Sequence, residues 1–505
     1  MIIVKRIKST SRRIMFLVIQ MSVCLAIIGF SVTQYAQATP TPTPTPIDID
    51  YLTYSDIDSP SELDEPYPDV CVYPFYFDNY WYDYVRGMDG DKSGTAVHLL
   101  PSGKTYATAY TSDITNSVAT DGSNDPYIVI KAPVDAAHPD LSTLSPQPPS
   151  DQLWFSRMAR IFGVINEDDD TVHAIFHAED TYGDDGLYNG NMSNGGHRNY
   201  ARIGLVSSSD PLDYDEDDAI LLLECFMNEE SWREHHPTDG DYDNLSNDRV
   251  GGIRHPWPIE VTIDSIDYIY IFYDRILSSL FRDSILDNPS VSQTEKNDLI
   301  AAFSEYTDTI EPCPSEICVA RAEKDDFLDF ANGTSSTNPF YNFYDGDFDS
   351  PPVNAVSGGI VTATAYSTPI IDPGDSNVYR ETPSVCYNQY LVSYTMLVFG
   401  QDASVGHSIK MHLNTNNDLT EWDGGMRIDL DSEISGLNIA GGDQGKYPSF
   451  IHHSSGYGIP SCDAGNATNV GDRVFLYFSD FDGTDDDTLD GTTRTLWLIL
   501  MDFDF

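Results

Sequence analysis

Basic residues are scarce in this chain. Its 505 residues include 27 lysines and arginines against 80 aspartates and glutamates, which gives a formal net charge of -53 at pH 7. Such a chain repels nucleic acid and anionic membrane surfaces, so both are excluded as partners. A surface rich in aspartate and poor in lysine is typical of a solvated face in salty surroundings, or of a face that binds divalent cations.

Cysteine is also rare, with seven residues in all. Cys24 lies in the N-terminal apolar stretch described below, and the other six are Cys71, Cys225, Cys313, Cys318, Cys386 and Cys462. An even number in an exported chain favours disulfides, and Cys313 and Cys318 are close enough in the sequence to close a small loop. The six lack the paired ligand spacing of a zinc site, which is the alternative.

The first forty residues have the pattern of a secretory signal peptide. Basic residues at positions 5–13 precede an apolar stretch, 14–30, and an Ala-Gln-Ala cleavage site lies at 36–38. We therefore expect residues 1–38 to be removed, the mature protein to be secreted or periplasmic, and no membrane contact after cleavage. An uncleaved membrane anchor is the alternative, because the apolar stretch is near the shortest that spans a bilayer.

The rest of the chain divides into three parts by composition. Four Thr-Pro repeats at 39–46 predict an extended polyproline linker. Residues 47–83 are acidic and aromatic, and too apolar for a disordered tail, so we expect a short N-terminal extension packed on the domain. The domain itself is expected to span 84–505.

Five segments of nearly the same texture recur along this domain. Aromatic or β-branched residues alternate in them with small or polar ones, which is the period of a β-strand. The segments are 105–110, 172–177, 268–273, 391–398 and 474–479. Their uneven spacing predicts long loops and excludes a short-period solenoid.

A turn signal follows three of the segments. An aspartate stands about four residues before an aromatic residue in 207–214, 322–330 and 416–422. The aspartate can cap a turn by bonding backbone amides, while the aromatic residue packs between neighbouring sheets. The repeated strand and turn predict an all-β fold, a five-bladed β-propeller, which we expect to be a monomer. Six or seven blades are possible if the long loops contain further strands.

Two features depart from the repeat. Between Asp274 and Cys313 the pattern predicts one helical insertion, because Ser292 and Glu295 form a capping box ahead of an apolar helical face. Residues 496–501 form a last strand-like run, which either completes the last blade or pairs with an N-terminal strand.

One motif carries a resemblance to a known family. The segment 381–385, Glu-Thr-Pro-Ser-Val, followed by the tyrosine-rich 390–394, resembles strands of five-bladed propeller glycosidases, the arabinanase, β-xylosidase and invertase-like superfamily, or an exported branch related to it. The resemblance spans 84–505 and implies that Glu381 is the general acid. It also implies that Asp89, in Met-Asp-Gly-Asp at 88–91, is the base or nucleophile. Glycoside hydrolysis needs such a pair of carboxyl groups.

The chain departs from this superfamily at its third carboxylate. Arg254 and Pro256 flank the corresponding position, where His255 stands. An imidazole cannot replace a carboxylate in orienting sugar hydroxyls, so either another carboxylate serves or the site binds without cleaving. Glu179 is the substitute candidate. We expect Arg254, His255 and Trp257 to bind the substrate, Trp257 by stacking on a sugar ring.

Metal-binding patterns are present but unspecific. Asp239, Asp241 and Asp243 have the oxygen density that calcium prefers, yet no glutamate follows at the spacing of a helix-loop-helix site. The resemblance also implies a central ion near His452 and His453. We expect calcium as a possible ligand and no organic cofactor.

These patterns lead to two functional hypotheses. The first is an exported carbohydrate-active protein, glycoside hydrolase-like, that acts on plant- or microbe-derived glycan in the central funnel of the propeller. The second is a non-catalytic propeller that binds carbohydrate or a surface. Glu381 and Asp89 favour catalysis, and His255 favours binding alone.

Overall fold

The structure is a computed structural model of the chain. It describes residues 43–53, 73–78, 80–89, 92–100, 128–131, 158–167, 171–181, 199–225, 250–276, 315–353, 355–357, 360–363, 365–371, 380–402, 406–416, 418–428, 446–452, 469–471, 473–481 and 494–504. The chain divides into two units, and the features below belong to the larger one, Pro44–Asp502. Of the smaller unit, Met1–Thr43 with Phe503–Phe505, the structure describes Thr43, Phe503 and Asp504.

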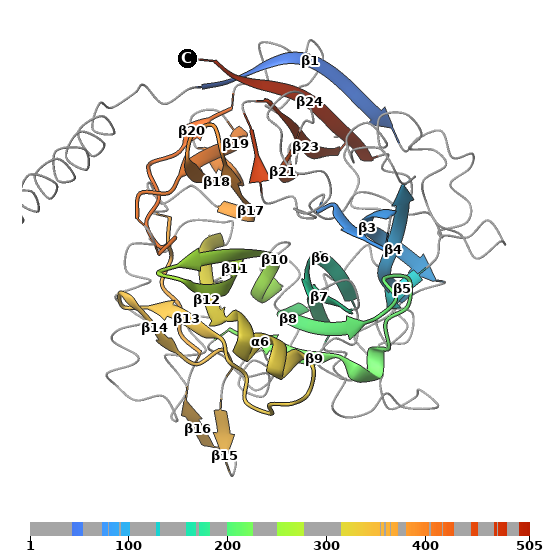
Figure 1. Cartoon of the computed structure of the whole chain (residues 1–505), viewed down its shortest axis with the longest axis vertical. Coiled ribbons are helices and arrows are strands. Elements are labelled where there is room, and N and C mark those ends of the chain that lie inside the picture. The colour runs from blue at the N-terminus through green and yellow to red at the C-terminus, as the bar shows by residue number, and fades with distance from the viewer. Residues whose placement is uncertain are drawn as a thin grey trace, which may run out of the picture. The chain divides into compact units, whose positions relative to one another are not determined.

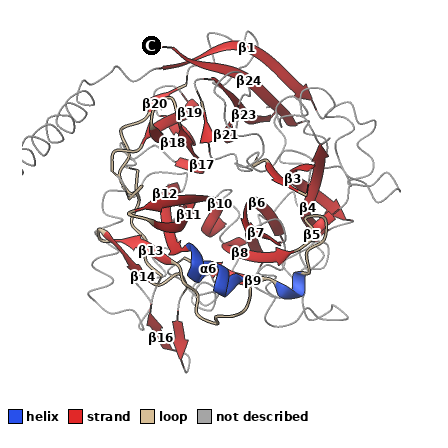
Figure 2. Cartoon of the chain, in the orientation of Figure 1, coloured by secondary structure: helices blue, strands red, loops and turns tan. Residues whose placement is uncertain are grey.

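Strands dominate the described residues, as Figure 2 shows. The helical elements among them are the α-helix α6, Lys324–Ala331, and the short 3-10 helix η5, Glu216–Asp218. The predicted all-β class is therefore confirmed. No helix in the described part of the chain is long and apolar enough to cross a membrane.

Most of the strands form groups of strands that follow one another in the chain (Figure 1). The first group is β2 (Phe75–Phe77), β3 (Tyr80–Asp89), β4 (Lys92–Leu100) and β5 (Ile128–Lys131), and the second is β6 (Met158–Glu167), β7 (Thr171–Thr181), β8 (Asn199–Ser208) and β9 (Ile220–Leu223). The third is β10 (Val250–Ile263), β11 (Ile266–Ile276), β12 (Ser315–Glu323), β13 (Tyr341–Tyr344) and β14 (Asp347–Ser350). Neighbours within each of these groups are antiparallel.

Two further groups complete the series. The fourth is β17 (Arg380–Asn388), β18 (Ser393–Asp402), β19 (Gly406–Leu413) and β20 (Met426–Arg427), and the fifth is β21 (Lys446–His452), β23 (Arg473–Phe481) and β24 (Arg494–Asp504). β1 (Thr43–Thr53), which begins inside the Thr-Pro repeats, is the neighbour of β24. The last strand therefore does both things that its sequence allowed: it belongs to the fifth group and pairs with an N-terminal strand. Outside the groups, β15 (Ala355–Ser357) pairs with β16 (Ile360–Ala363), and β22 (Asn469–Val470) pairs with β17.

Each group after the first is connected to the one before it through its own first strand. β4 pairs in parallel with β6, and β8 pairs in parallel with β10, which joins the first three groups into one 13-stranded sheet. β10 also lies next to β6 and β17, and β17 lies next to β21. No sheet closes on itself among the strands that the structure describes. The first strands β6, β10, β17 and β21 thus form a connected series inside the larger unit.

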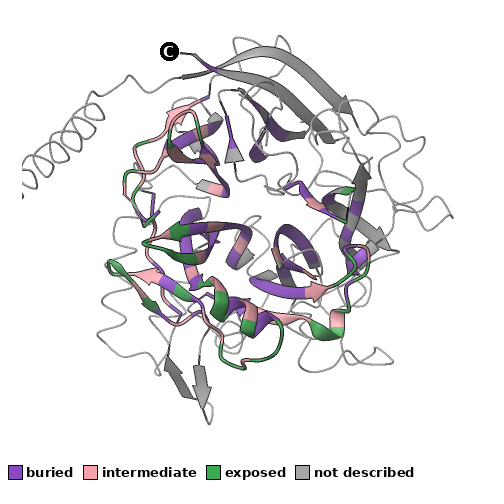
Figure 3. Ribbon diagram, in the orientation of Figure 1, coloured by how far each residue is buried: buried purple, intermediate pink, exposed green. Residues whose placement is uncertain are grey.

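Both faces of β7 and β11 are buried over most of their length, which explains the apolar texture of the repeated segments there. In β11, Tyr270 and Phe272 belong to one hydrophobic cluster, whereas Ile269, Ile271 and Tyr273 belong to a second cluster. Successive side chains of a strand point to opposite faces, so the alternation fills two packed layers with one strand. Burial is continuous over 172–178 in β7 and over 269–275 in β11, and both stretches are purple in Figure 3. The segments 172–177, 268–273 and 474–479 are strands as predicted, the segment 391–398 becomes a strand at Ser393, and 105–110 lies outside the described residues.

One of the three predicted turns has the expected aspartate cap, and a second is capped by a different residue. The Asp210 carboxylate accepts a hydrogen bond from the Leu212 amide at 2.9 Å, and Tyr214 is buried, with its hydroxyl 2.9 Å from that of Tyr84. In the segment 416–422 the capping oxygen belongs to Asn416, which accepts from the Thr420 amide at 3.2 Å. The aromatic residue of each turn packs between elements, as predicted.

The third predicted turn is wrong. Residues 322–330 form the end of β12 and most of α6. Asp325 and Asp326 in the first helical turn favour a helix, because acidic side chains interact well with a helix N-terminus. Phe327, Phe330 and Ala331 share one buried face. Of the helical insertion predicted between Asp274 and Cys313, the structure describes Arg275 and Ile276, which are the last two residues of β11. The rest of the insertion lies outside the described residues.

The predicted loop closed by Cys313 and Cys318 is not formed. Cys318 is a free, buried thiol in the middle of β12, and so are Cys225 and Cys386 elsewhere. Cys318 is in register with Tyr273, where strand pairing directs its side chain into the second hydrophobic cluster. Cys71, Cys313 and Cys462 lie outside the described residues.

Gly252 fixes the contact between the second and third groups, and it provides a test of the fold. Its φ of +102° suits glycine alone, and a Cβ there would lie 2.2 Å from the Ala201 carbonyl oxygen. We expect Gly252→Ala to lower the free energy of unfolding by about 2 kcal/mol or more, measured by urea denaturation. Gly424→Ala is the matched control, because nothing lies within 4 Å of its Cβ position. Equal stability of the two variants would contradict this packing.

Candidate functional site

The first strands of four groups share one irregularity. In each, the first strand has one residue step more than the second strand that it faces, so one extra residue is inserted as a β-bulge. The bulges lie between Ile161 and Gly163 in β6, Arg254 and Trp257 in β10, Glu381 and Ser384 in β17, and Lys446 and Ser449 in β21. A charged residue directly precedes the bulge on β10, β17 and β21, and an apolar one precedes it on β6.

Three of the bulges hold a strained residue. His255, Thr382 and Tyr447 have φ of 49°, 54° and 57°, and none of them is glycine. Each of them also precedes a proline, which disfavours helical backbone conformations in the residue before it. Such conformations cost about 1–3 kcal/mol each and persist at functional sites, where the surrounding structure holds them. The inner bulges are therefore candidate site positions.

A buried carboxylate holds two of the bulges together. Asp274, on β11, is fully buried and accepts hydrogen bonds from His255 Nδ1 at 2.5 Å and from Arg254 Nε and Nη2 at 3.1 and 3.0 Å. Ser315 Oγ donates to it at 3.1 Å, and the backbone amide of Thr382 at 3.3 Å. Burial acts to raise the pKa of the Asp274 carboxyl, but His255 and Arg254 outweigh it, so this pKa lies well below its usual range.

The ionised state of Asp274 decides the tautomer of its neighbour. A carboxylate only accepts hydrogen bonds, so Nδ1 of His255 must carry the proton that lies between the two groups. Burial lowers the pKa of Arg254, but Asp274 and Glu381 outweigh it and raise this pKa. The cluster is therefore a cationic guanidinium held by an ionised carboxylate.

Arg254 also reaches Glu381, the glutamate of the Glu-Thr-Pro motif. Its Nη2 donates to Glu381 Oε2 at 2.8 Å. The exposed fraction of the side chain falls through the cluster, from 16% for Arg254 and 12% for Glu381 to 6% for His255 and 0% for Asp274. Arg254 and Glu381 are therefore the members that a ligand can touch, and Asp274 and His255 support them from behind.

Aromatic rings close the buried side of the cluster. The ring of His255 lies 5.2 Å from that of Phe162, 5.5 Å from that of Tyr447 and 5.4 Å from that of His177, centre to centre. These rings come from three different strands, β6, β21 and β7. Burial, His255 and two arginines lower the pKa of His177 well below 6.5, so this histidine is neutral near pH 7.

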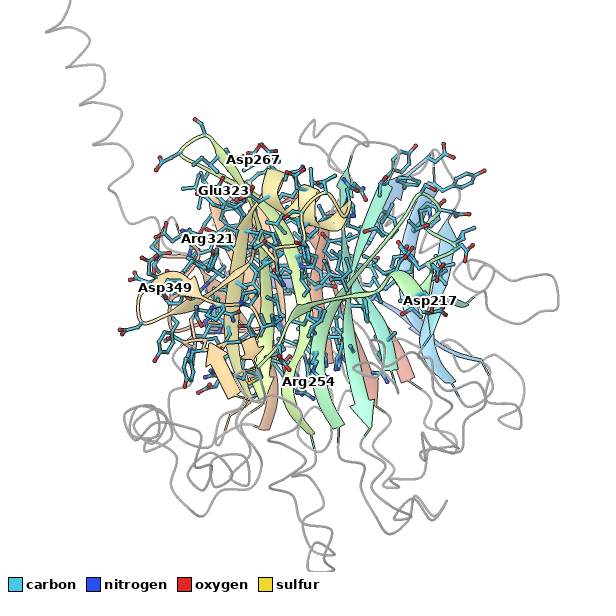
Figure 4. All side chains as sticks on the ribbon, turned by 90° about the horizontal axis from the view of Figure 1, so that it is seen from below. Asp217, Arg254, Asp267, Arg321, Glu323 and Asp349 are labelled. Carbon is cyan, nitrogen blue, oxygen red and sulfur yellow. The ribbon has the colours of Figure 1, made fainter. Side chains whose placement is uncertain are left out.

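The cluster lies toward one end of the strands. Figure 4 shows Arg254 near the lower end, whereas Asp267 and Glu323 lie near the upper end. Arg254 is close to the start of β10, and Asp267 follows the turn from β10 to β11. The bulges of the other first strands are also close to their starts, so the site belongs to the end at which the first strands begin.

The same residues offer ligand atoms for a cation. His255, Asp274 and Glu381 each present one ligand atom within 4.8 Å of the others. The guanidinium of Arg254 donates to both carboxylates, so a fixed positive charge already compensates them. A metal ion bound there would have to displace Arg254. In this arrangement the Arg254 guanidinium itself supplies the positive charge between the two carboxylates.

The structure brings together three residues that the sequence indicated, Glu381, Arg254 and His255. Trp257 has a different place: its indole is 1% exposed, donates to the Val385 carbonyl at 2.8 Å and packs against Tyr73. It is a core side chain, out of reach of a sugar, because the bulge turns the strand between His255 and Trp257.

The other predicted site residues are placed by backbone or lie outside the described part. Asp89 ends β3 in register with Lys92, and Glu179 lies on β7 in register with Met158. Their roles stay predictions. His452 is the last residue of β21, and His453, Asp239, Asp241 and Asp243 lie outside the described residues.

Asp274 is the site residue that sequence reasoning missed. It follows directly on the predicted strand 268–273, where it reads as a simple strand end. A polar residue that immediately ends a fully apolar run was the available signal. Its partners Arg254 and His255 come from the neighbouring strand through the register, which the sequence does not display.

Comparison with solved structures gives distant similarities to glycosidases. The catalytic domain of a Coprinopsis cinerea GH62 α-L-arabinofuranosidase is 11% identical, with a TM-score of 0.37, and the match covers 91% of this chain and 97% of that chain. The α-L-arabinofuranosidase of Podospora anserina in complex with cellotriose is 9% identical, with a TM-score of 0.39 and coverage of 92% and 97%. The α-L-arabinanase of Cellvibrio cellulosa is 12% identical, with a TM-score of 0.34 and coverage of 72% and 78%.

An arabinanase and arabinofuranosidases are thus among the solved structures that this chain is similar to, as the sequence resemblance predicted. No protein-family model and no curated protein matches the chain.

His177 makes stability depend on pH. Its folded pKa lies below the unfolded value of about 6.5, so the unfolded chain takes up a proton first as the pH falls. The contribution of His177 to stability is present above pH 6.5 and is lost below it, by up to about 1.4 kcal/mol per pH unit. Urea unfolding between pH 7 and pH 5 should therefore show a shallower pH slope for His177→Gln than for the unmodified chain. Identical slopes would contradict a neutral, buried His177.

Proposed function

We propose that this protein is a glycoside hydrolase-like enzyme built as a five-bladed β-propeller. The groups that start at β2, β6, β10, β17 and β21 are the blades in this proposal. Contacts between successive first strands β6, β10, β17 and β21 support it, because blades of a propeller meet through their inner strands. The substrate would enter at the end of the strands where the bulges lie.

One observation carries the enzymatic proposal. Glu381 lies before a strained bulge, is partly exposed, and is held by Arg254, which Asp274 anchors from the buried side. A carboxyl group fixed in this way at the accessible edge of a polar cluster is positioned to act on a glycosidic bond. Glu381 is therefore assigned as the general acid, in agreement with the motif in which it stands.

The supporting residues have separate tasks. Arg254 orients the Glu381 carboxyl through one hydrogen bond, and Asp274 keeps Arg254 in place through two. His255 is held by Asp274 and fills the space behind them. Asp274 is fully buried and so cannot itself touch a substrate. The second carboxyl that hydrolysis requires is therefore another residue, and Asp89 is our candidate for it.

The setting of the reaction follows from the N-terminal sequence and the charge. The signal-peptide pattern of residues 1–38 supports export, and a strongly acidic surface supports a neutral or hydroxyl-rich polymer over nucleic acid. We therefore propose a plant- or microbe-derived glycan as the substrate. Calcium bound by the acidic segments remains part of this proposal as a stabilising ion.

A non-catalytic carbohydrate-binding propeller is the second candidate. The observation that favours it is His255, which stands where the superfamily is expected to carry a carboxylate. In this structure the His255 side chain is buried and hydrogen-bonded to Asp274, so the position that would carry the third carboxylate offers no carboxylate at the accessible edge. Binding without turnover is the result that distinguishes this candidate.

Glu381→Gln tests the enzymatic proposal. The amide keeps the size of the side chain but cannot donate the catalytic proton, so turnover of arabinan, xylan, fructan or aryl-glycosides should fall by about 100-fold or more, with binding retained. Reducing-sugar release measures turnover, and calorimetry measures binding.

Glu421→Gln is the matched control for this test. Glu421 is an exposed glutamate in another part of the fourth group, so its variant should keep full turnover. Equal turnover of the Glu381→Gln variant and the unmodified chain would contradict the assignment of Glu381. Binding by the unmodified chain without any turnover would favour the second candidate.

A further inference from the structure

Three of the first strands have an edge with few strand partners near their bulges. Among the described strands, β6 pairs opposite β7 at Met158, β10 pairs opposite β11 at 250–252, and β17 pairs opposite β18 at 387–388. Elsewhere that edge of each strand faces no other described strand. Buried backbone carbonyls still need hydrogen-bond donors, so side chains are expected to supply them there.

Tyr73 supplies such a donor to two of these strands. It lies two residues ahead of β2, and its hydroxyl oxygen is 3.2 Å from the carbonyl oxygen of Val164 on β6 and 3.2 Å from that of Pro258 on β10. A phenol has a single hydrogen, so the two carbonyls share it. Burial raises the pKa of Tyr73, and Glu260 raises it further, so the hydroxyl keeps this hydrogen. One side chain therefore links β6 and β10.

The link lies directly after both bulges. The bulge of β6 ends at Gly163, one residue before Val164, and the bulge of β10 ends one residue before Pro258. A Cβ at Gly163 would lie 2.6 Å from the Pro258 Cδ and 3.0 Å from the Tyr73 Cδ2. Glycine at this position therefore lets β6 come close enough to β10 for one hydroxyl to reach both strands.

Trp257 extends the link to a third strand. Its ring centre lies 4.8 Å from that of Tyr73, edge to face, and its Nε1 donates to the Val385 carbonyl of β17 at 2.8 Å. Val385 directly follows the end of the β17 bulge. On the other side of the same two bulges, Arg254 donates to Glu381 at 2.8 Å. The spacing of β10 and β17 is thus fixed on both sides of their bulges.

We propose that Tyr73 is a positioning residue of the proposed active site, which holds β6, β10 and β17 at the spacing that lets Arg254 reach Glu381. The inference rests on the proposed function and adds the segment ahead of β2 to the same site. Tyr73 is 3% exposed, so it acts through the strands and does not touch the substrate. A displacement of about 1 Å at a reacting group can cost about 100-fold in rate, so this spacing matters for turnover.

Tyr73→Phe tests the inference on the full chain. The variant keeps the ring that packs on Trp257 but removes the hydroxyl, so two buried carbonyls lose their shared donor. We expect kcat on the preferred glycan to fall about tenfold with KM changed less than about threefold, because the reacting geometry is lost while the binding surface remains. Reducing-sugar release over a range of glycan concentrations gives both constants.

Tyr84→Phe is the matched control. Tyr84 is also 3% exposed, and its hydroxyl donates to a proline carbonyl, that of Pro211, at 3.1 Å. It lies on β3, and its hydrogen-bond partners Pro211 and Tyr214 follow β8, so its contacts involve none of the bulges. The control should lower the melting temperature about as much as Tyr73→Phe does, with turnover unchanged.

A second comparison separates positioning from a general loss of stability. In the Glu381→Gln background, Tyr73→Phe should lower the residual kcat less than about twofold, because the carboxyl group that it positions is already gone. A general loss of folded protein would lower kcat by the same factor in both backgrounds. Trp257→Phe is the second variant: it removes the donor to Val385 and should also lower kcat in the unmodified background only.

The outcomes distinguish the inference from the proposed function. If Glu381→Gln is inactive but Tyr73→Phe has normal turnover, the inference is overturned and the proposed function stands. Equal losses in Tyr73→Phe and Tyr84→Phe, or failure of both Tyr73→Phe and Trp257→Phe to fold, also overturn it. If the unmodified chain turns over no glycan, the proposed function fails and the inference fails with it. A kcat loss confined to the variants at Tyr73 and Trp257 supports it.

Discussion

The site depends on one buried carboxylate. Asp274 has no exposed surface, yet it is ionised, because a guanidinium, an imidazole, a hydroxyl and a backbone amide all donate to it. A buried charge without such partners would cost several kcal/mol. Its donors come from β10, β12 and β17, so the interaction fixes how two groups of strands meet. The accessible pair, Arg254 and Glu381, is held in place by this arrangement.

The same interaction offsets local strain. His255 and Thr382 adopt left-handed backbone conformations ahead of prolines, which is costly for both residues. In these conformations the His255 side chain and the Thr382 amide both reach Asp274. The hydrogen bonds to the Asp274 carboxylate therefore offset part of the conformational free energy that the two bulges cost. The bulges in turn place Arg254 and Glu381 where they contact each other. The strained backbone of His255 and Thr382 and the position of the accessible pair therefore both depend on the hydrogen bonds of the buried Asp274.

Local sequence patterns predicted much of the fold and part of the site. Alternation identified the strands around Tyr270 because it records burial on both faces. The Glu-Thr-Pro motif led to Glu381 through its resemblance to a known family, and the structure places Glu381 beside Arg254. Asp274 could not be found in this way, since its role comes from cross-strand register. The segment 322–330 was misread because an acidic helix start and a capped turn use the same residues, and Cys318 because sequence proximity says nothing of strand direction.

The coupling between Asp274 and Arg254 is the most direct test of this account. A double-mutant cycle with Asp274→Asn, Arg254→Gln and the double variant, measured by urea unfolding at pH 7, gives the interaction energy between the two side chains. We expect a favourable coupling of about 1.5 kcal/mol or more, because the pair is buried and doubly hydrogen-bonded. Additive effects, with a coupling near zero, would show that Asp274 does not hold Arg254 and would contradict the central claim.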